Sequence, residues 1–489
     1  MTTTTDGRLE TSRAQATTLA MQSRVRHEAA GTALIGADIE VPLVTGGMRR
    51  YVNLDYAASA PCLVAVKQAV DELLPWYSSV HRGAGFKSQL ATEAYEGARA
   101  AVRLFLRARS DDCVLFTRNT TDAINLLASA LPPGAAVVCF ASEHHANLLP
   151  WRRRDVTFLP VPHSPGEALD RLDQALRWIR ADARLVAVTG ASNVTGEIWP
   201  YAEIARLAHR HGARVLLDAA QLAPHHPIDV TGSEVDYVAI SGHKLYAPFG
   251  AGALVGRPDW LGSGEPFLVG GGAVDYVGVD DVLWSDLPDR QEAGSPNVLG
   301  AVALGMACRT LQTAEMGRLA ATETALLDAA QAGVTSVAGA RPYRLWPAEH
   351  PRIGVLPFNL HGVSYAKLAA VLSAEYGIGV RHGCFCAHPL MTHLLGIDDA
   401  HSREIRANRR SGRPVTVPGA VRLSVGLGTT IEDITRLADA VAAIARDGAA
   451  WHYQTSTDGT DCWPDPDPRP RPTVPFELSS TRSCLEATA

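Results

Sequence analysis

The chain has 489 residues, of which 46% are hydrophobic and 20% are charged, and its formal net charge is −6. This composition indicates a globular protein with a large core, and it excludes wholesale disorder and a basic surface for nucleic acid. The polar N-terminus and the lack of any apolar run of about eighteen residues predict a cytoplasmic protein without a membrane span. Its 8 cysteines at irregular spacing do not indicate a disulfide framework.

The order of composition along the chain predicts four segments. An arm rich in Thr, Ala and Arg comes first, with a helix near residues 13–30, and a proline-rich tail comes last. Between them we expect two domains, joined by a helix from Val298 to about Ala332. The predicted boundaries are 1–45 for the arm, 46–315 for a large domain, 316–448 for a smaller C-terminal domain and 449–489 for a disordered tail.

In the large domain, short apolar runs alternate with stretches whose apolar residues recur at helical spacing. The predicted strands are Cys113–Phe116, Ala136–Phe140, Arg184–Val188, Val215–Leu217 and Tyr237–Ile240, and the predicted helices are 121–131, 169–180 and 201–211. This alternation predicts a mostly parallel sheet with helices on both faces.

Polar clusters follow these strands at their carboxyl ends. The clusters are Asn119–Thr121, Glu143–His145, Ser192–Asn193, Asp218 and Ser241–Lys244. Ligands of parallel sheets bind beyond the carboxyl ends of the strands, so we expect these side chains to meet in one site.

Lys244 follows a buried strand and precedes a turn rich in Gly and Pro. A solvated loop lysine is the ordinary alternative for such a position. Its neighbours Ser241 and His243 can donate to a phosphate, however, and a lysine amine can form a Schiff base with a carbonyl cofactor. Together these groups are typical of a pyridoxal phosphate (PLP) site.

Other strand-end residues suit the same cofactor. Asp218 can hold the pyridine nitrogen protonated and Gln221 can bond the ring hydroxyl, although an Asp there can equally cap a helix. Thr120 and Thr121 open a helix, where they form either an anion site or a plain N-terminal cap. His144 can stack on the ring, and Asn193 can contact the ring hydroxyl or the substrate.

A series of motifs runs through the chain in a fixed order. The motifs are Tyr51–Ala60, Val80–Gly83, Glu143–Asn147, Ser192–Gly196, Asp218–Gln221, Ser241–Pro248 and Glu292–Asn297. Together they resemble the class V aminotransferase-fold cysteine desulfurases, especially the group II enzymes and the related selenocysteine lyases. The resemblance spans about residues 51–446. It implies a PLP-dependent enzyme of fold type I, with a mostly parallel seven-stranded sheet flanked by helices and a smaller α+β domain.

The resemblance also implies roles for single residues. Lys244 would carry PLP, Asp218, His144, Gln221 and Asn193 would contact the ring, and Thr120, Thr121, Ser241 and His243 would hold the phosphate. Ser295 would reach the phosphate of the cofactor in the partner subunit, which implies a homodimer with active sites at its interface. Arg422, whose planar fork suits a carboxylate, would bind the amino-acid substrate together with Arg381 and His81.

Cys386 falls where the family carries its nucleophilic cysteine. There it would take sulfur from L-cysteine as a persulfide and release alanine, with Arg381 or a neighbouring His favouring its thiolate. Cys384-Phe385 stands where the family has a His-His pair, and this Cys-Phe-Cys is similar to molybdenum cofactor sulfurases. Cys384 is either a second thiol that resolves a persulfide as a disulfide or a small packed residue. The spacing does not match a metal site.

The segment 397–419 makes the distance from Cys386 to Arg422 longer than in the compact form of the family. It contains a basic run from His401 to Arg413. Such a run is a solvated loop, a lid or a docking strip for an acidic sulfur-acceptor protein.

Several functions fit the sequence besides cysteine desulfuration. Selenocysteine lyase, C–S lyase, epimerase or another class V reaction would use the same cofactor. A non-catalytic PLP-fold scaffold or sulfur-carrier partner is the alternative from another class of protein.

Overall fold

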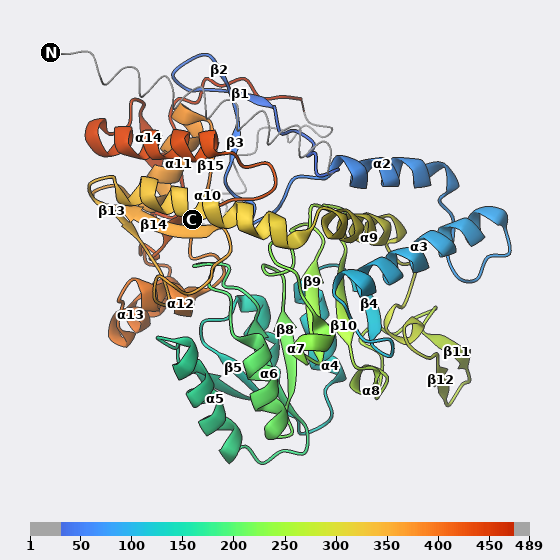
Figure 1. The fold of residues 1–489 in the computed structure, drawn as a ribbon. Helices are drawn as coiled ribbons and strands as arrows, with labels where there is room; N and C mark the ends of the chain where they lie inside the picture. The colour runs from blue at the N-terminus through green and yellow to red at the C-terminus, as the bar shows by residue number, and fades with distance from the viewer. Residues whose placement is uncertain (1–30, 474–489) are drawn as a thin grey trace.

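The computed structural model describes residues 31–473. The helix expected near residues 13–30 and the last part of the tail lie outside this range. The described chain forms a large domain and a smaller one (Figure 1). Within the described range, no helix has the length and apolar character to cross a membrane.

The large domain is built on a sheet in the order β4-β10-β9-β8-β7-β5-β6. All its strands run parallel except β10, which pairs antiparallel with β4 and β9. The fold prediction of a mostly parallel, seven-stranded sheet is therefore confirmed. The strands are β4 (Cys113–Thr117), β5 (Ala136–Phe140), β6 (Asp155–Leu159), β7 (Arg184–Thr189), β8 (Arg214–Asp218), β9 (Tyr237–Ser241) and β10 (Gly252–Gly256).

Helices cover both faces of this sheet because alternate strand residues point to opposite sides. Val138 and Val186 belong to the core on one face, and Val137 and Leu185 belong to the core on the other. Three helices lie where the sequence predicts them: α4 (Thr120–Ala130), α5 (Pro165–Trp178) and α6 (Tyr201–Arg210). The remaining long helices of this domain are α2 (Val64–Leu73), α3 (Phe86–Phe105) and α9 (Val298–Thr313).

The single helix expected from Val298 to about Ala332 is wrong. The segment forms two helices, α9 and α10 (Met316–Thr335). Glu315 between them has a φ of +59°, in the left-handed region that ends a right-handed helix. The sequence pattern does not reveal this break, because the apolar residues continue on both sides of it.

The small domain has an antiparallel sheet in the order β13-β14-β17-β16. Its strands are β13 (Ala340–Pro342), β14 (Val355–Leu360), β16 (Arg381–Gly383) and β17 (Ala420–Ser424), and its helices include α10, α11 (Tyr365–Tyr376) and α14 (Ile431–Asp447). An early segment joins it, since β3 (Val52–Asn53) pairs in parallel with β15 (Ile378–Gly379). Val52 and Leu54 accordingly lie in the core of the small domain.

The beginning of the C-terminal tail is folded, contrary to its proline-rich composition. A hairpin of β18 (Tyr453–Thr455) and β19 (Cys462–Pro464) packs against α11. Buried Glu375 of α11 accepts hydrogen bonds from the backbone N–H groups of Ala450 and Trp451, at 2.9 and 3.0 Å, and from the hydroxyl of Tyr453. One carboxylate on a distant helix thus anchors the beginning of this segment.

The basic run of the 397–419 segment is a helix, α13 (Asp399–Arg410), and not a loop. The carboxylate of Asp398 caps it by accepting the N–H of His401 at 2.8 Å. Arg409 pairs with Asp458 at 2.9 Å and so joins α13 to the C-terminal hairpin. A shorter helix, α12 (His388–Leu394), connects the cysteine motif to this region.

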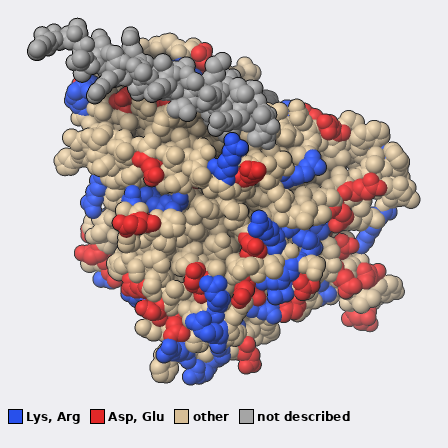
Figure 2. Space-filling model, in the orientation of Figure 1, with Lys and Arg blue, Asp and Glu red and all other residues tan. Residues whose placement is uncertain are grey.

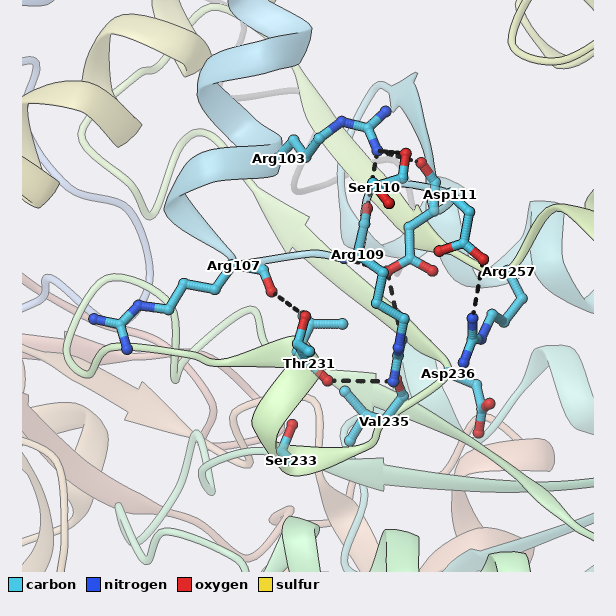
Figure 3. A network of polar contacts seen from close by, with 12 residues as sticks. Arg103, Arg107, Arg109, Ser110, Asp111, Thr231, Ser233, Val235, Asp236 and Arg257 are labelled. Atoms are coloured by element: carbon cyan, nitrogen blue, oxygen red, sulfur yellow. Dashed lines mark hydrogen bonds and ion pairs between the residues drawn. The ribbon is translucent and has the colours of Figure 1, made fainter.

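A polar network fixes the turn between α3 and β4 (Figure 3). The guanidinium of Arg109 donates to the carbonyl of Val235 at 3.0 Å, and the carbonyl of Arg107 accepts from Thr231 at 2.8 Å. These contacts tie the start of the edge strand β4 to α7 (Val230–Ser233) and to the start of β9. Acidic and basic side chains are interspersed on the face drawn in Figure 2.

Candidate active site

A cavity of about 270 Å³, called the inner cavity below, lies beyond the carboxyl ends of the parallel strands. One wall is made by the large domain and the other by the small domain. Twelve of the predicted site residues line it: Thr120, Thr121, His144, Asn193, Asp218, Gln221, Ser241, His243, Lys244, Arg381, Cys386 and Arg422. The polar clusters that follow the separate strands therefore do meet at one edge of the sheet.

Lys244 and Asp218 come from the ends of neighbouring strands, β9 and β8. Desolvation lowers the pKa of Lys244 to about 8, although the charge of Asp218 opposes this shift. Burial raises the pKa of Asp218, against the opposing effects of the Ala220 N–H and of Lys244. Lys244 can therefore be neutral, and nucleophilic, near physiological pH.

His144 lies in the same cavity as a neutral ring. Its Nδ1 accepts the backbone N–H of Ala146 at 3.0 Å, which leaves the proton on Nε2. Burial, together with Lys244 and other nearby cations, lowers the pKa of His144 to about 3. Glu143 supports the turn from behind, since its carboxylate accepts from Asn147 at 2.8 Å and from the N–H of Thr189 at 3.0 Å. The sequence analysis assigned Glu143 no role.

Three buried oxygens at the cavity have no hydrogen-bond partner among the described residues. They are Thr120 Oγ1, Ser241 Oγ and Gln221 Oε1. Buried polar atoms are almost always paired, so these three oxygens, which face the cavity, are available to bind a ligand. Asn119 meanwhile caps α4 by accepting the N–H of Asp122 at 3.0 Å. At the start of α4, Asn119 therefore provides the helix cap, and the hydroxyl of Thr120 remains available to a ligand.

Arg422, on β17, closes the inner cavity from the small domain. Its guanidinium donates to the carbonyl of Asn193 at 2.8 Å and to Asp55 at 3.3 Å, and it lies 5.0 Å from the ring centre of Phe385. The side chain is 3% exposed, and its Nε is unpaired among the described residues. Burial lowers the pKa of Arg422 to about 10, a value at which the group is still a cation at neutral pH.

The cysteine motif forms a strained turn between β16 and α12. Phe385 and Cys386 both lie in the left-handed region, with φ of +55° and +54°. Non-glycine residues in this region cost about 1–3 kcal/mol each and persist where their surroundings hold them. Here the side chain of Asn193 donates to the carbonyl of Phe385 at 2.7 Å, and the N–H of His145 donates to the carbonyl of Cys386 at 2.8 Å.

A larger cavity of about 1010 Å³, the outer cavity, lies on the other side of this turn. Cys386 lines both cavities, whereas Cys384 lines only the outer one. The outer wall comes from α13 and from the C-terminal hairpin, with Arg406, Arg409 and Thr460 among its residues. The outer cavity beside Cys386 is thus bounded by two segments. One is the 397–419 segment, which is longer than in the compact form of the family, and the other is the C-terminal hairpin, which follows the region of resemblance.

Two predicted site residues do not reach the inner cavity of their own chain. His81 and Ser295 line a separate cavity of about 700 Å³. The ring of His81 contacts Glu96 at 3.0 Å and packs edge-on against Tyr95. Close by, Arg99 forms a buried ion pair with Glu292 at 2.9 Å.

The residues that hold the cysteine turn could not be identified from the sequence. Asn193, expected at the ring hydroxyl or the substrate, lines the inner cavity, and its amide donates to the carbonyl of Phe385. His145 does not line the inner cavity, and its Nε2 lies 3.1 Å from Nδ1 of His388. The only signal in the sequence was the density of histidines in the Glu143–His145 and Cys384–His388 motifs.

Comparison with known proteins agrees with this geometry. The Aminotransferase class-V family matches residues 52–437. A Halalkalibacterium halodurans protein named "Probable cysteine desulfurase" is 38% identical over 355 residues, which make up 70% of this chain and 86% of that protein. A cysteine desulfurase solved in its apo form, from Thermococcus onnurineus NA1, is 29% identical with a TM-score of 0.71, over 81% of this chain and 95% of its own.

An Escherichia coli cysteine desulfurase, solved as an S-sulfonic acid, is 32% identical with a TM-score of 0.67. The match covers 80% of this chain and 94% of that one. By these matches the chain belongs to the class V aminotransferase family and is a cysteine desulfurase-like enzyme.

Proposed function

We propose that this protein is a PLP-dependent cysteine desulfurase, which transfers the sulfur of L-cysteine to Cys386 and releases alanine. The observation that carries the proposal is the position of Cys386. It reaches the inner cavity from the small domain, and Lys244 and Asp218 line the same cavity from the large domain. A lysine amine, a buried carboxylate, a carboxylate-binding arginine and a thiol are the groups that this reaction needs.

The donor groups of the inner cavity fit PLP. The unpaired hydroxyls of Thr120 and Ser241 suit a phosphate, and the unpaired Oε1 of Gln221 suits the ring hydroxyl. Asp218 would pair with a protonated ring nitrogen, whose charge would offset the burial that raises the pKa of this carboxyl. When bound, PLP supplies an electron sink that acidifies the Cα proton of an amino acid.

The protein residues then divide the work among them. Arg422 binds and orients the carboxylate of the substrate, aided by Arg381. Lys244 would be the amine that holds the cofactor and would move the proton at Cα, and His144 would hold the cofactor ring from one face. The thiolate of Cys386 attacks the substrate sulfur, so that an S–S bond forms while the Cβ–S bond breaks and Cβ takes up a proton. The products are alanine and a persulfide, and no external oxidant or reductant is consumed.

We infer that the active enzyme is a homodimer with its sites at the subunit interface. Ser295 and His81 support this, because they line a cavity of their own, away from the inner cavity of the same chain. Large apolar side chains are exposed near this second cavity: Trp76 (46%), Phe86 (67%), Tyr276 (69%) and Leu283 (61%). Tyr276 and Leu283 lie on the projecting hairpin of β11 (Val274–Val277) and β12 (Val282–Trp284), visible at the lower right of Figure 1.

A single substitution on that hairpin tests the dimer. Leu283→Asp should shift sedimentation of the PLP-loaded protein from dimer to monomer and lower its activity. Wild-type protein that sediments as a monomer at full activity would exclude the shared site. We also expect this enzyme to act in the reducing cytoplasm, where cysteines remain thiols. Its substrate there would be a small amino acid, and its sulfur would pass to an acceptor.

The reaction is tested by product analysis. PLP-loaded protein is freed of reductant and incubated with L-cysteine, and the products are identified by mass. We expect alanine, and one added sulfur on the peptide that contains Cys386. Cys386→Ser should lose both, whereas Cys62→Ser, a matched substitution outside both cavities, should behave as wild type.

Other outcomes point to the alternatives. Undiminished turnover of an amino acid by Cys386→Ser would indicate a selenocysteine lyase or another C–S lyase that does not use the thiol. Formation of the D-isomer would indicate an epimerase. A protein that remains colourless after addition of PLP would indicate a non-catalytic scaffold.

A further inference from the structure

Cys384 and Cys386 face different spaces although only Phe385 lies between them. Cys386 borders the inner and the outer cavity, and Cys384 borders the outer one alone. Phe385 is 7% exposed and packs on Arg422, so it fills the wall between the two cavities. A sulfur atom on Cys386, which is exposed, therefore lies at the boundary of the two cavities, whereas the half-buried Cys384 belongs to the outer cavity alone.

Cys384 is also the first of three groups that can share a proton. Its Sγ lies 3.8 Å from Nδ1 of His388, and that nitrogen lies 3.1 Å from Nε2 of His145. The two imidazole rings stack at an angle of 10° with their centres 5.0 Å apart. Nε2 of His145 in addition accepts the backbone N–H of His388 at 3.3 Å.

Both rings are available as bases. Desolvation and the charge of Arg409 lower the pKa of His388, and desolvation and His388 lower the pKa of His145. Neutral imidazole is the form that accepts a thiol proton. The reaction proposed for the inner cavity uses neither ring.

We propose that Cys384 is a second sulfur carrier, which takes the terminal sulfur from the persulfide of Cys386 and presents it in the outer cavity. His388, backed by His145, is the base that receives the proton of the Cys384 thiol. The inference rests on the proposed function, because it begins with a persulfide on Cys386.

The transfer is balanced in atoms and electrons. The Cys384 thiolate attacks the outer sulfur of the protonated Cys386 persulfide, and a new S–S bond forms on Cys384 while the S–S bond on Cys386 breaks. The Cys386 sulfur leaves as a thiolate and regains the proton that His388 took up. The net change is the movement of one sulfur atom between two thiols, which returns Cys386 to the form that the next substrate needs.

The pinned backbone of the turn favours this transfer. The carbonyls of Phe385 and Cys386 are both hydrogen-bonded to the large domain, so the backbone that carries the two thiols is held in place while sulfur moves. Arg406 and Arg409 give the outer cavity a basic wall, near which an anionic acceptor would approach Cys384.

The experiment maps the sulfur within one peptide. Full-length, PLP-loaded protein receives one equivalent of L-cysteine without reductant, is alkylated with iodoacetamide at a series of times, and is digested with trypsin. Cleavage after Arg381 and Arg403 gives a peptide with both cysteines, and fragment ions on either side of Phe385 assign the added sulfur. In wild type, sulfur should appear first on Cys386 and then on Cys384.

Variants separate the steps. In Cys384→Ser the sulfur should stay on Cys386, and in Cys386→Ser neither position should carry it. His388→Asn should slow the appearance of sulfur on Cys384 at least roughly tenfold, as expected for loss of a general base. His393→Asn, on the same helix but outside the outer cavity, is the matched control and should behave as wild type.

Two results would overturn the relay while leaving the proposed function intact: sulfur that stays on Cys386 in wild type, or a Cys384–Cys386 disulfide with release of hydrosulfide. Direct loading of Cys384 in Cys386→Ser would overturn the relay and also the assignment of Cys386 as the first acceptor. Absence of sulfur from both cysteines in wild type, with no alanine formed, would instead overturn the proposed function and the relay together.

Discussion

The two walls of the inner cavity are built in different ways. On the large-domain wall, each functional side chain stands at the end of a parallel strand, and its position follows from the sheet. On the small-domain wall, Cys386 stands in a turn of strained residues that depends on hydrogen bonds from the opposite wall. The geometry of the first wall is thus set by local structure. The turn of the second wall has its observed geometry only when the two domains are in contact.

The largest expected effect removes the central group of the strand-end wall. Lys244→Ala should abolish the absorbance of PLP linked to the protein and lower kcat at least roughly 100-fold, because the amine both links to the cofactor and moves the proton. Absorbance spectra and alanine release measure this. Lys67→Ala, on the surface of α2, serves as the control. Unchanged absorbance and turnover in Lys244→Ala would refute the assignment of this wall.

The next effect probes the contact between the walls. Arg422→Lys should raise the KM for L-cysteine roughly tenfold or more, because a hydrogen bond to a charged group is worth about 1.5–3 kcal/mol and a lysine cannot bind a carboxylate in a bidentate way. Steady-state kinetics measure it. Arg341→Lys, on exposed β13, should leave KM unchanged. An unchanged KM in Arg422→Lys would mean that another cation binds the substrate.

A smaller effect separates two roles for Asn193. If it holds the cysteine turn, Asn193→Ala should slow the loading of Cys386 roughly fivefold to tenfold, equivalent to about 1–1.5 kcal/mol, and leave the PLP spectrum as it is. If it contacts the ring hydroxyl, as the resemblance implies, the spectrum should shift. Asn125→Ala, whose amide only bonds within α4, is the control.

The smallest effect on activity concerns the C-terminal hairpin. Glu375→Ala leaves two backbone N–H groups and one hydroxyl without their acceptor, so we expect a loss of about 1–3 kcal/mol in the free energy of unfolding. Denaturant unfolding measures the loss, and proteolysis should cut first after residue 448. Glu404→Ala, an exposed carboxylate of α13, is the control. Equal stability of the two variants would show that the hairpin is held by other contacts.

The same contrast explains how much the sequence alone could predict. Strand-end residues were predictable because a buried strand has a readable apolar run, and its end is marked by the first polar residues. The parallel sheet then places these ends together. Lys244, Asp218 and His144 were identified in this way before any contact was known.

The remaining features depend on contacts between distant segments. The hydrogen bond from Asn193 to Phe385 and the contact of His145 with His388 each join the two domains, and no local pattern encodes them. Proline-rich composition predicted disorder after residue 448, but part of that segment forms a hairpin. The buried carboxylate of Glu375 on α11 accepts hydrogen bonds from the beginning of this segment. The basic run predicted a solvent-exposed segment. It forms the charged helix α13, and one face of this helix, with Ile405 and Arg409, lines the outer cavity.

The hydrogen bonds that hold the cysteine turn end on main-chain carbonyls, those of Phe385 and Cys386. These bonds fix the shape of the turn without using its side chains. A substitution at position 384 should therefore leave the backbone that carries the thiol at 386 in place. The backbone of the turn would keep its shape. A change of the side chain at position 384 would then alter the chemistry of the outer cavity and leave the reaction in the inner cavity unchanged.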